Sequence, residues 1–178
     1  MADSYSYSVL IADESHIRYI PDILSAIYAA SQAKGNSIVM RDPEYLAVKM
    51  REGKAVIALC GNEFAGFCYI ESWQRDNFIA NSGLIVKPEY RRMGLAKKIK
   101  KLIFEICRTK FPSACIFSIT KSPAVKKMNL ALGFKEVNYT ELTTDPKFWK
   151  GCETCPHYPE LLENEMKACQ CMGMLFKP

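Results

Sequence analysis

The sequence lacks the long apolar run that a membrane-spanning helix requires. None of its segments approaches the ~20 consecutive apolar residues that cross a bilayer. Its N-terminus, from Met1 to Tyr7, has neither the basic segment nor the apolar core of a secretory signal. We therefore expect a cytoplasmic protein that has no membrane partner.

The sequence also lacks internal repeats, low-complexity tracts and a nucleic-acid-binding motif. Its formal charge of +5 is modestly basic, but the basic residues are not interleaved with aromatic ones in the stripe that binds nucleic acid. We therefore expect no nucleic-acid partner. A modest positive charge suits a polyanionic small ligand instead.

The length of the chain limits the number of domains. Its 178 residues are enough for one domain with a substantial core and too few for two comfortable ones. We therefore predict a single domain over residues 1–178.

Cysteine, in contrast, is abundant, with eight residues in the chain. Without a secretory signal, these residues are read as thiols or metal ligands rather than as a disulfide framework. The pattern Cys152-x-x-Cys155 followed by Cys169-x-Cys171 has a spacing compatible with tetrahedral zinc, and His157 could replace one ligand. Buried or incidental thiols are the alternative, and a reversible disulfide is a third option.

Hydrophobic periodicity predicts the secondary structure. Runs of apolar and β-branched residues predict strands at Tyr5–Ile11, Ala55–Cys60, Phe64–Trp73, Ile79–Val86, Ala114–Ile119 and Phe134–Tyr139. Apolar stripes and capping signals predict helices at His16–Ala30, Arg41–Arg51, Leu95–Thr109 and Ser122–Leu132. Asp42 and Ser122 each precede a proline, the pattern of an N-cap followed by the first helical residue.

The stretch from Asn81 to Thr109 organises the chain as a strand, a tight turn and a helix. Pro88 ends the strand because proline cannot donate to a ladder. Gly94 stands where the helix begins, and a glycine there lets backbone N–H groups approach a bulky anion. Basic residues surround this glycine, namely Arg91, Arg92, Lys97, Lys98, Lys100 and Lys101. Lysines at a helix N-terminus oppose the helix dipole, which costs stability unless an anion is bound nearby. The pattern therefore predicts a phosphate site.

Two motifs resemble those of the GNAT superfamily of N-acetyltransferases. Val86-x-Pro88-x-x-Arg91-Arg92-x-Gly94-x-Ala96 is similar to its Gln/Arg-x-x-Gly-x-Gly/Ala signature after a strand that ends in Val. The run from Ser122 to Phe134, which ends in Leu-Gly-Phe, resembles its second block. The predicted order of elements over residues 5–139 also matches. The resemblance implies an α/β (α+β) fold, a single GNAT-like domain whose mixed central sheet of about seven strands is flanked by about four helices.

The resemblance implies an enzyme that transfers the acetyl group of acetyl-CoA directly to a primary amine of a small molecule, with an amino acid as one candidate. In the family the turn wraps the pyrophosphate, and the strand edge at Ile85 and Val86 would pair with the pantetheine arm and polarise the thioester carbonyl. The cofactor-binding residues so implied are Leu84, Ile85, Val86, Arg91, Arg92, Met93, Gly94, Leu95, Ala96, Ser122 and Asn129.

The catalytic residues are harder to predict from the resemblance. Many family members carry a tyrosine five residues before the Phe of Leu-Gly-Phe, and Asn129 occupies that position here. An amide cannot usefully exchange a proton, so Asn129 could only hydrogen-bond to the cofactor or the thiolate. Glu71 is the best candidate for the base, and Asp76, His157 and Tyr158 are alternatives. We predict Glu71, Asn129 and Tyr158 as the catalytic set.

The acceptor site is predicted from the segments that would line it. These segments contain Tyr28, Asn36, Arg41, Tyr139, Trp149 and Tyr158. Arg41 or Arg75 could bind a substrate carboxylate through a bidentate fork, which favours an amino-acid-like acceptor. The alternatives are a peptide or protein acceptor, and a CoA-binding sensor or metal-stabilised binding module without turnover.

The last stretch, residues 140–178, is atypical of the family. We expect a long loop that carries the cysteine cluster, a short helix within Pro156–Met166, and a last strand at Cys169–Phe176. Family members often dimerise through late strands, so a homodimer is also a candidate assembly.

Overall fold

The computed structural model describes residues 6–32, 39–155, 158, 169 and 171–178. Apart from Tyr158, the segment Pro156–Met166, where a short helix is expected, lies outside these residues, as do the candidates Asn36 and His157. No helix in the described ranges is long and apolar enough to cross a membrane.

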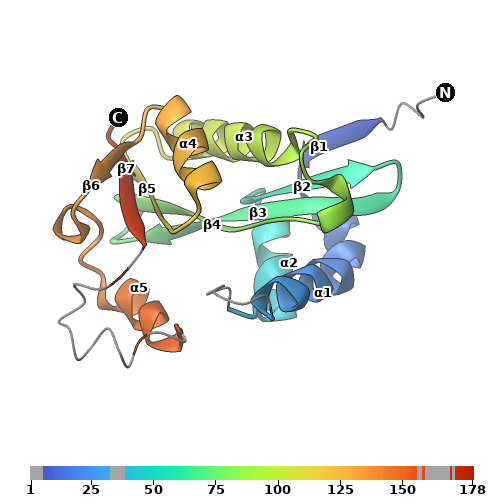
Figure 1. Cartoon of the computed structure of the whole chain (residues 1–178), viewed down its shortest axis with the longest axis horizontal. Coiled ribbons are helices and arrows are strands. Elements are labelled where there is room, and N and C mark those ends of the chain that lie inside the picture. The colour runs from blue at the N-terminus through green and yellow to red at the C-terminus, as the bar shows by residue number, and fades with distance from the viewer. Residues whose placement is uncertain (1–5, 33–38, 156–157, 159–168, 170) are drawn as a thin grey trace. The chain divides into compact units, whose positions relative to one another are not determined.

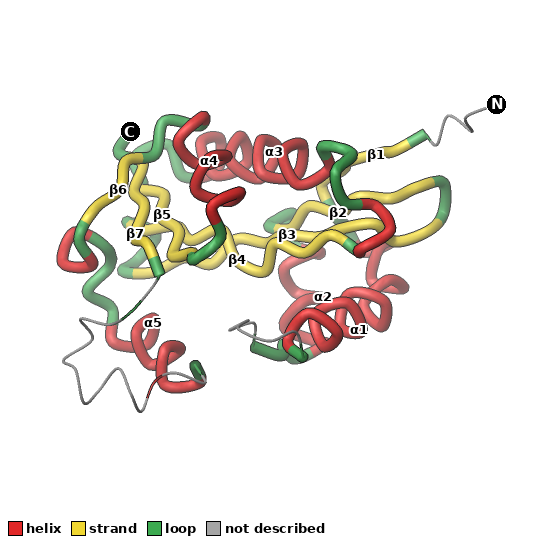
Figure 2. The backbone as a smooth tube through the Cα atoms, in the orientation of Figure 1, coloured by secondary structure: helices red, strands yellow, loops and turns green. Residues whose placement is uncertain are grey.

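The strands form one mixed seven-stranded sheet, which confirms the predicted fold class, and their order is β1-β2-β3-β4-β5-β7-β6 (Figure 2). Its strands are β1 Tyr7–Ile11, β2 Ala55–Cys60, β3 Glu63–Trp73, β4 Phe78–Val86, β5 Cys115–Thr120, β6 Lys135–Val137 and β7 Met172–Phe176. The pairs β1–β2, β2–β3, β5–β7 and β6–β7 are antiparallel, and the pair β4–β5 is parallel. The α-helices are α1 Ile20–Ser31, α2 Pro43–Arg51, α3 Leu95–Lys110, α4 Pro123–Ala131 and α5 Pro146–Lys150.

The chain divides into two compact units, residues 1–70 with 81–109 and residues 71–80 with 110–178. In the first unit, α1 and α2 cover one side of β2 and β3, and α3 lies on the other side (Figure 1). The alternation of side chains along β3 explains this arrangement, because Phe67 and Tyr69 belong to the core cluster under α1 and α2, whereas Gly66 lies against Ile99 of α3.

The helix predicted at His16–Ala30 is two elements. Glu14–Tyr19 forms a 3₁₀ turn that Asp13 caps, with the Asp13 carboxylate 2.9 Å from the N of Ser15. The α-helix begins only at Ile20, and Pro21 lies in its first turn, where no intrahelical N–H is needed. The predicted N-cap of α2 is confirmed, since Asp42 Oδ1 accepts from the N of Tyr45 at 2.9 Å.

The second unit has its own core, formed by Ala80, Phe117, Leu142 and Leu175 with partly buried aromatic residues around them. Phe148 of α5 packs edge-to-face against Trp73 at 5.4 Å and Phe117 at 4.9 Å between ring centroids. The described part of residues 140–178 is therefore more than a loop, because its helix α5 contributes to this core. The predicted last strand is present but begins at Met172 rather than Cys169. A single domain over residues 1–178 stays a prediction.

Candidate active site

The turn between β4 and α3 has the backbone geometry of an anion site. Arg92 and Gly94 have φ of +65° and +77°, in the left-handed region. A Cβ on Gly94 would meet nothing within 4 Å, so glycine is needed there for its conformation rather than for space. The N of Lys98 donates to the O of Gly94 at 3.1 Å, which starts the helix. The first N–H groups of α3 therefore emerge at this turn.

The charge around the turn is positive. The first turn of α3 contains no acidic residue, and Arg91, Arg92, Lys97 and Lys98 are exposed around it. Arg91 Nε donates to the carbonyl of Val86 at 3.1 Å, which ties the loop to the end of β4. Helix N–H groups, the positive end of the helix dipole and these cations together suit a phosphate group.

Two tyrosines that the motif does not specify fix this turn, Tyr90 from within its span and Tyr7 from β1. Tyr90 Oη donates to Glu63 Oε2 at 2.7 Å, and this hydrogen bond raises the pKa of Tyr90. Tyr7 Oη donates to Met93 Sδ at 2.9 Å, and its ring lies 6.2 Å from that of Tyr90. Neither contact could be predicted from the sequence, because no local pattern indicates a bond between residues so far apart in the chain.

The strand before the turn has a bend. The ladder between β4 and β5 covers Phe78 to Ala80 of β4, whereas β4 itself runs to Val86. Gly83, within the later half, has φ of +65°, which no ordinary strand residue adopts. The predicted cofactor residues Leu84, Ile85 and Val86 follow this bend directly.

A buried polar cluster contacts β4 just before this bend. Cys68 Sγ donates to the carbonyl of Ser82 and Cys107 Sγ to Asn81 Oδ1, both at 3.3 Å. Lys100 is only 2% exposed, and burial lowers its pKa, while the two thiols partly oppose this shift. Burial raises the pKa of Cys68 to about 11 and that of Cys107 to about 12.

The burial of Lys100 corrects the expectation that four lysines surround the phosphate site. Lys97, Lys98 and Lys101 are exposed, but Lys100 lies on the same stripe of α3 as Ile103 and Cys107. Residues three and seven positions apart share a helix face, so this lysine follows the apolar stripe into the core.

Asn129 is fully buried on α4. Its Nδ2 lies 3.6 Å from Met174 Sδ, and its Oδ1 has no hydrogen-bond partner in the described part of the chain. Ser122 caps α4, since its Oγ accepts from the N of Val125 at 3.3 Å. The contacts of both side chains with a cofactor stay predictions.

The candidates for the base lie apart along the chain. Glu71 is half-buried near the end of β3, and Asp76 is exposed in the turn that follows. Tyr158 is half-buried, and its N donates to the carbonyl of Cys155 at 2.9 Å.

The turn after β3 is unusual, because Gln74, Arg75 and Asp76 all have positive φ, between 50° and 65°. The Gln74 side chain fixes it, with Nε2 donating to Thr144 Oγ1 at 2.6 Å and Oε1 accepting from Thr143 Oγ1 at 3.0 Å. The turn therefore presents Arg75 to solvent on a fixed backbone.

The residues predicted to line the acceptor site have different roles. Arg41 donates to Tyr69 Oη and to the carbonyl of Val39, the latter at 2.6 Å, and Tyr28 is 57% exposed. Tyr139 and Trp149 pack on each other at 5.6 Å, and Trp149 Nε1 donates to Thr143 O at 2.7 Å, within the core of the second unit.

The four late cysteines are half-buried, and none of them forms a disulfide bond within the described ranges. Tyr139 Oη donates to Cys169 Sγ at 3.3 Å and to the carbonyl of Cys171. Burial, reinforced by Cys169, raises the pKa of Cys171 to about 11. Across the described ranges, no three His, Cys, Asp or Glu side chains are placed to hold a metal ion. The zinc alternative, which the spacing of Cys152, Cys155, Cys169 and Cys171 allows, thus gains no support from these residues.

Comparison with known proteins places this turn in a family. The sequence model of the Acetyltransferase (GNAT) family matches residues 21–134, a range that includes the turn. No curated protein matches the sequence significantly.

Solved structures share the fold. N-acetylglutamate synthase from Neisseria gonorrhoeae, complexed with coenzyme A and N-acetyl-glutamate, matches 99% of this chain at a TM-score of 0.67 and 14% identity, and the chain spans only 36% of that protein. YncA from Salmonella typhimurium, with its cofactor acetyl-CoA, matches at a TM-score of 0.60 and 13% identity. The match covers 75% of this chain and 82% of YncA. The ribosomal-protein-S18-alanine N-acetyltransferase from Escherichia coli matches at a TM-score of 0.57 and 11% identity. The match covers 97% of this chain and 94% of that protein.

At these identities the structural matches establish the fold, and the family model, which covers well over half of the chain, establishes the family. This protein belongs to the GNAT family of acetyltransferases, which use acetyl-CoA as the acetyl donor.

Proposed function

We propose that this chain transfers the acetyl group of acetyl-CoA directly to the primary amine of a small molecule, and that the acceptor is an amino acid. The observation that supports acetyl-CoA as the donor is the geometry of the β4–α3 turn, where Gly94 has a left-handed backbone conformation. The first turn of α3 contains no acidic residue, and exposed arginine and lysine side chains surround it. Such a turn fits the pyrophosphate of CoA.

The proposed donor site extends from this turn along β4. Arg91, Arg92, Met93, Gly94, Leu95 and Ala96 would surround the pyrophosphate. Leu84, Ile85 and Val86 would pair with the pantetheine arm, and their backbone N–H groups would polarise the thioester carbonyl. Ser122 and Asn129 are proposed as further contacts, and neither can act as an acid.

Proton transfer requires a base more than an acid. The acceptor amine must be neutral to attack, because its ordinary pKa keeps it protonated near pH 7. We assign this deprotonation to Glu71, directly or through a water molecule. A thiol has a pKa of about 8.5, so the departing CoA thiolate needs no strong acid, and water suffices in place of the missing tyrosine. Tyr158 remains an alternative proton donor.

The acceptor class is inferred from Arg75. Arg41 already donates to Tyr69 and to a backbone carbonyl, whereas Arg75 is exposed on a turn that Gln74 fixes. Glu71 lies near the end of β3 and Arg75 in the turn that follows this strand, and both belong to the same unit. A guanidinium beside the base would bind an α-carboxylate and present the amine next to it.

The test is turnover of acetyl-CoA against amino acids, polyamines and short peptides, followed by mass spectrometry. Mass detection is needed because eight cysteines would react with a thiol dye. An N-acetyl amino acid formed with an equal amount of CoA supports the proposal. Acetylated peptides alone would favour the peptide alternative, and binding of acetyl-CoA with no product from any acceptor would favour a sensor.

A further inference from the structure

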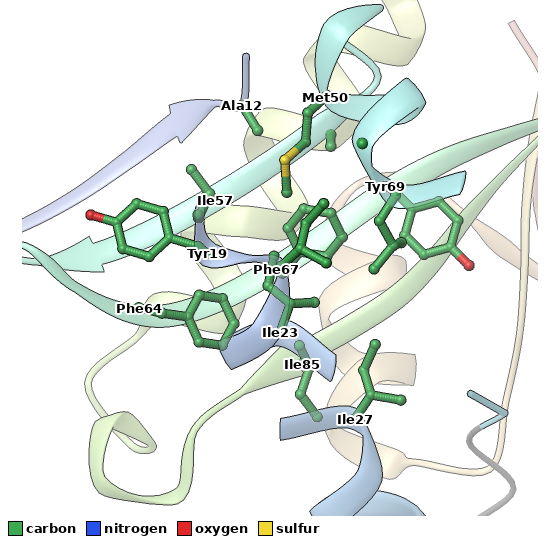
Figure 3. Close-up of a cluster of buried hydrophobic side chains, with 14 of the residues drawn as sticks. Ala12, Tyr19, Ile23, Ile27, Met50, Ile57, Phe64, Phe67, Tyr69 and Ile85 are labelled. Carbon is green, nitrogen blue, oxygen red and sulfur yellow. The ribbon is translucent and has the colours of Figure 1, made fainter. Parts of the chain in front are cut away.

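Tyr69 lies at the point where the core of the first unit meets the bend of β4. It is fully buried at one end of the core cluster, and its hydroxyl points away from the other labelled side chains (Figure 3). A Cβ on Gly83 would lie 3.0 Å from Tyr69 Cδ1 and nearer still to Cε1. The ring therefore occupies the space that any side chain at position 83 would need.

The bend at Gly83 sets the direction of the backbone that follows. A residue with φ of +65° turns the peptide planes of a strand out of their regular alternation. The orientation of the backbone N–H groups of Leu84, Ile85 and Val86 therefore depends on this bend. If the ring of Tyr69 moved, the backbone at Gly83 could relax toward a regular strand.

Arg41 fixes the position of Tyr69 from outside the core. Its Nε donates to Tyr69 Oη, and its Nη1 donates to the carbonyls of Val39 at 2.6 Å and Met40 at 3.4 Å. The ring of Tyr45 packs edge-to-face on Tyr69 at 6.0 Å. The segment before α2 is thus joined through one guanidinium to the tyrosine that abuts β4.

We propose that Arg41 and Tyr69 are positioning residues that hold the bend of β4 at Gly83, and with it the direction of the backbone N–H groups that polarise the acetyl thioester carbonyl. This inference rests on the proposed binding of acetyl-CoA along Leu84 to Val86. Neither side chain needs to touch the acetyl group for the effect.

The chain contains a matched control pair, whose tyrosine belongs to the same core cluster. Arg18 Nη2 donates to Tyr19 Oη at 3.2 Å, and Tyr19 Oη donates to the carbonyl of Asn62 at 2.9 Å. Tyr19 is 7% exposed, so it is also a buried tyrosine that binds an arginine. Its partner is the turn between β2 and β3, and not β4. Tyr19→Phe therefore removes the same group without affecting the bend.

The experiment uses acetyl-CoA labelled with ¹³C at the acetyl carbonyl and the full chain. The carbonyl chemical shift is measured free and bound for the wild type, Tyr69→Phe, Arg41→Ala and Tyr19→Phe, with the Kd of acetyl-CoA from calorimetry. We expect a downfield shift on binding to the wild type and Tyr19→Phe, of which Tyr69→Phe and Arg41→Ala lose about half or more. The Kd should change by less than about threefold, because the pyrophosphate contacts remain.

The same variants are then assayed with an acceptor found by the turnover panel. Tyr69→Phe should lower kcat about tenfold at an unchanged KM for acetyl-CoA, and Arg41→Lys should recover part of the loss of Arg41→Ala. A merely structural role would lower the melting temperature of Tyr69→Phe and Tyr19→Phe alike, without separating their carbonyl shifts.

The outcomes distinguish this inference from the function on which it rests. If acetyl-CoA binds but Tyr69→Phe and Arg41→Ala keep the wild-type carbonyl shift, the positioning role is wrong and the donor site stands. If the wild-type carbonyl does not shift on binding, the inference also fails. If calorimetry finds no binding to the wild type, both fail together. If Tyr69→Phe does not fold, the carbonyl shift of Arg41→Ala tests the inference, because the Arg41 side chain is only half-buried.

Discussion

At the scale of single residues, two glycines with similar φ serve different ends. Gly83 has φ of +65° and would clash with Tyr69 if it carried a side chain. Gly94 has φ of +77° and nothing within 4 Å of the position that a Cβ would take. Gly94 is recognisable in the sequence by its motif, but nothing near Gly83 in the sequence indicates the tyrosine that contacts it. The difference is that a motif is local, whereas a steric contact between neighbouring strands is not.

The charge state of Lys100 makes stability depend on pH. Burial lowers its pKa below the ordinary 10.5, so the unfolded state binds more protons than the folded state between the lowered pKa and 10.5. Lys100 therefore costs stability below the lowered pKa, and this cost disappears as pH rises toward 10.5. Lys100→Met should be more stable than the wild type by about 1 kcal/mol or more at low pH, with a difference that shrinks at alkaline pH.

Urea unfolding of Lys100→Met across this pH range measures the effect. Lys101→Met is the matched control, because the Lys101 side chain is 72% exposed on the same helix. A Lys100→Met variant that is less stable than the wild type at every pH would show that the ammonium has a partner stronger than the two thiols.

Arg75 provides the test of the acceptor class. Arg75→Ala should raise the KM for an amino acid acceptor about tenfold, since a charge-assisted contact to a carboxylate contributes about 1.5 kcal/mol or more. The KM for acetyl-CoA should not change. Arg75→Lys keeps the charge but not the bidentate fork, so its KM for the acceptor should lie between those of the wild type and Arg75→Ala. Steady-state kinetics with the best amino acid of the panel measures this, and an unchanged acceptor KM in Arg75→Ala would remove the assignment.

At the scale of elements, most helices and strands could be predicted, because each carries a local pattern. The Asp42-Pro43 and Ser122-Pro123 caps mark α2 and α4. The helix α5 was missed, because its five residues, Pro146–Lys150, are too few to show a period. The 3₁₀ turn at Glu14–Tyr19 was not separated from α1 for a related reason, since a 3₁₀ turn has nearly the same apolar spacing as an α-helix.

The helix α5 is attached to the second unit by Phe148. Its ring contacts Trp73, Phe117 and Trp149, so Phe148→Ala leaves a gap among aromatic side chains. We expect a loss of about 2 kcal/mol in the free energy of unfolding, less than for a fully buried phenylalanine because Phe148 is only half-buried. Urea denaturation measures it, and Lys147→Ala on the exposed side of α5 is the control. Equal stability of the two variants would show that α5 is not part of this core.

At the scale of the whole molecule, the family was predictable from two motifs in the right order, and the family model and the mixed seven-stranded sheet agree with it. The candidate site was less predictable, because its supports come from distant segments. Glu63 and Tyr7 fix the β4–α3 turn, and Arg41 fixes Tyr69, across separations that no motif spans. Lys100 shows the converse, since a basic residue beside a phosphate motif can belong to the core.

The most direct test of this account is the calorimetric titration of acetyl-CoA into the wild type, Gly94→Ala and Gly61→Ala. Gly61 also has a positive φ, +56°, with nothing within 4 Å of its Cβ position, so both substitutions carry a similar strain of about 1 kcal/mol. We predict that the wild type and Gly61→Ala bind with similar Kd and that Gly94→Ala binds at least about tenfold more weakly. Equal Kd for Gly94→Ala and Gly61→Ala, or no binding to the wild type, would contradict the placement of the donor at this turn.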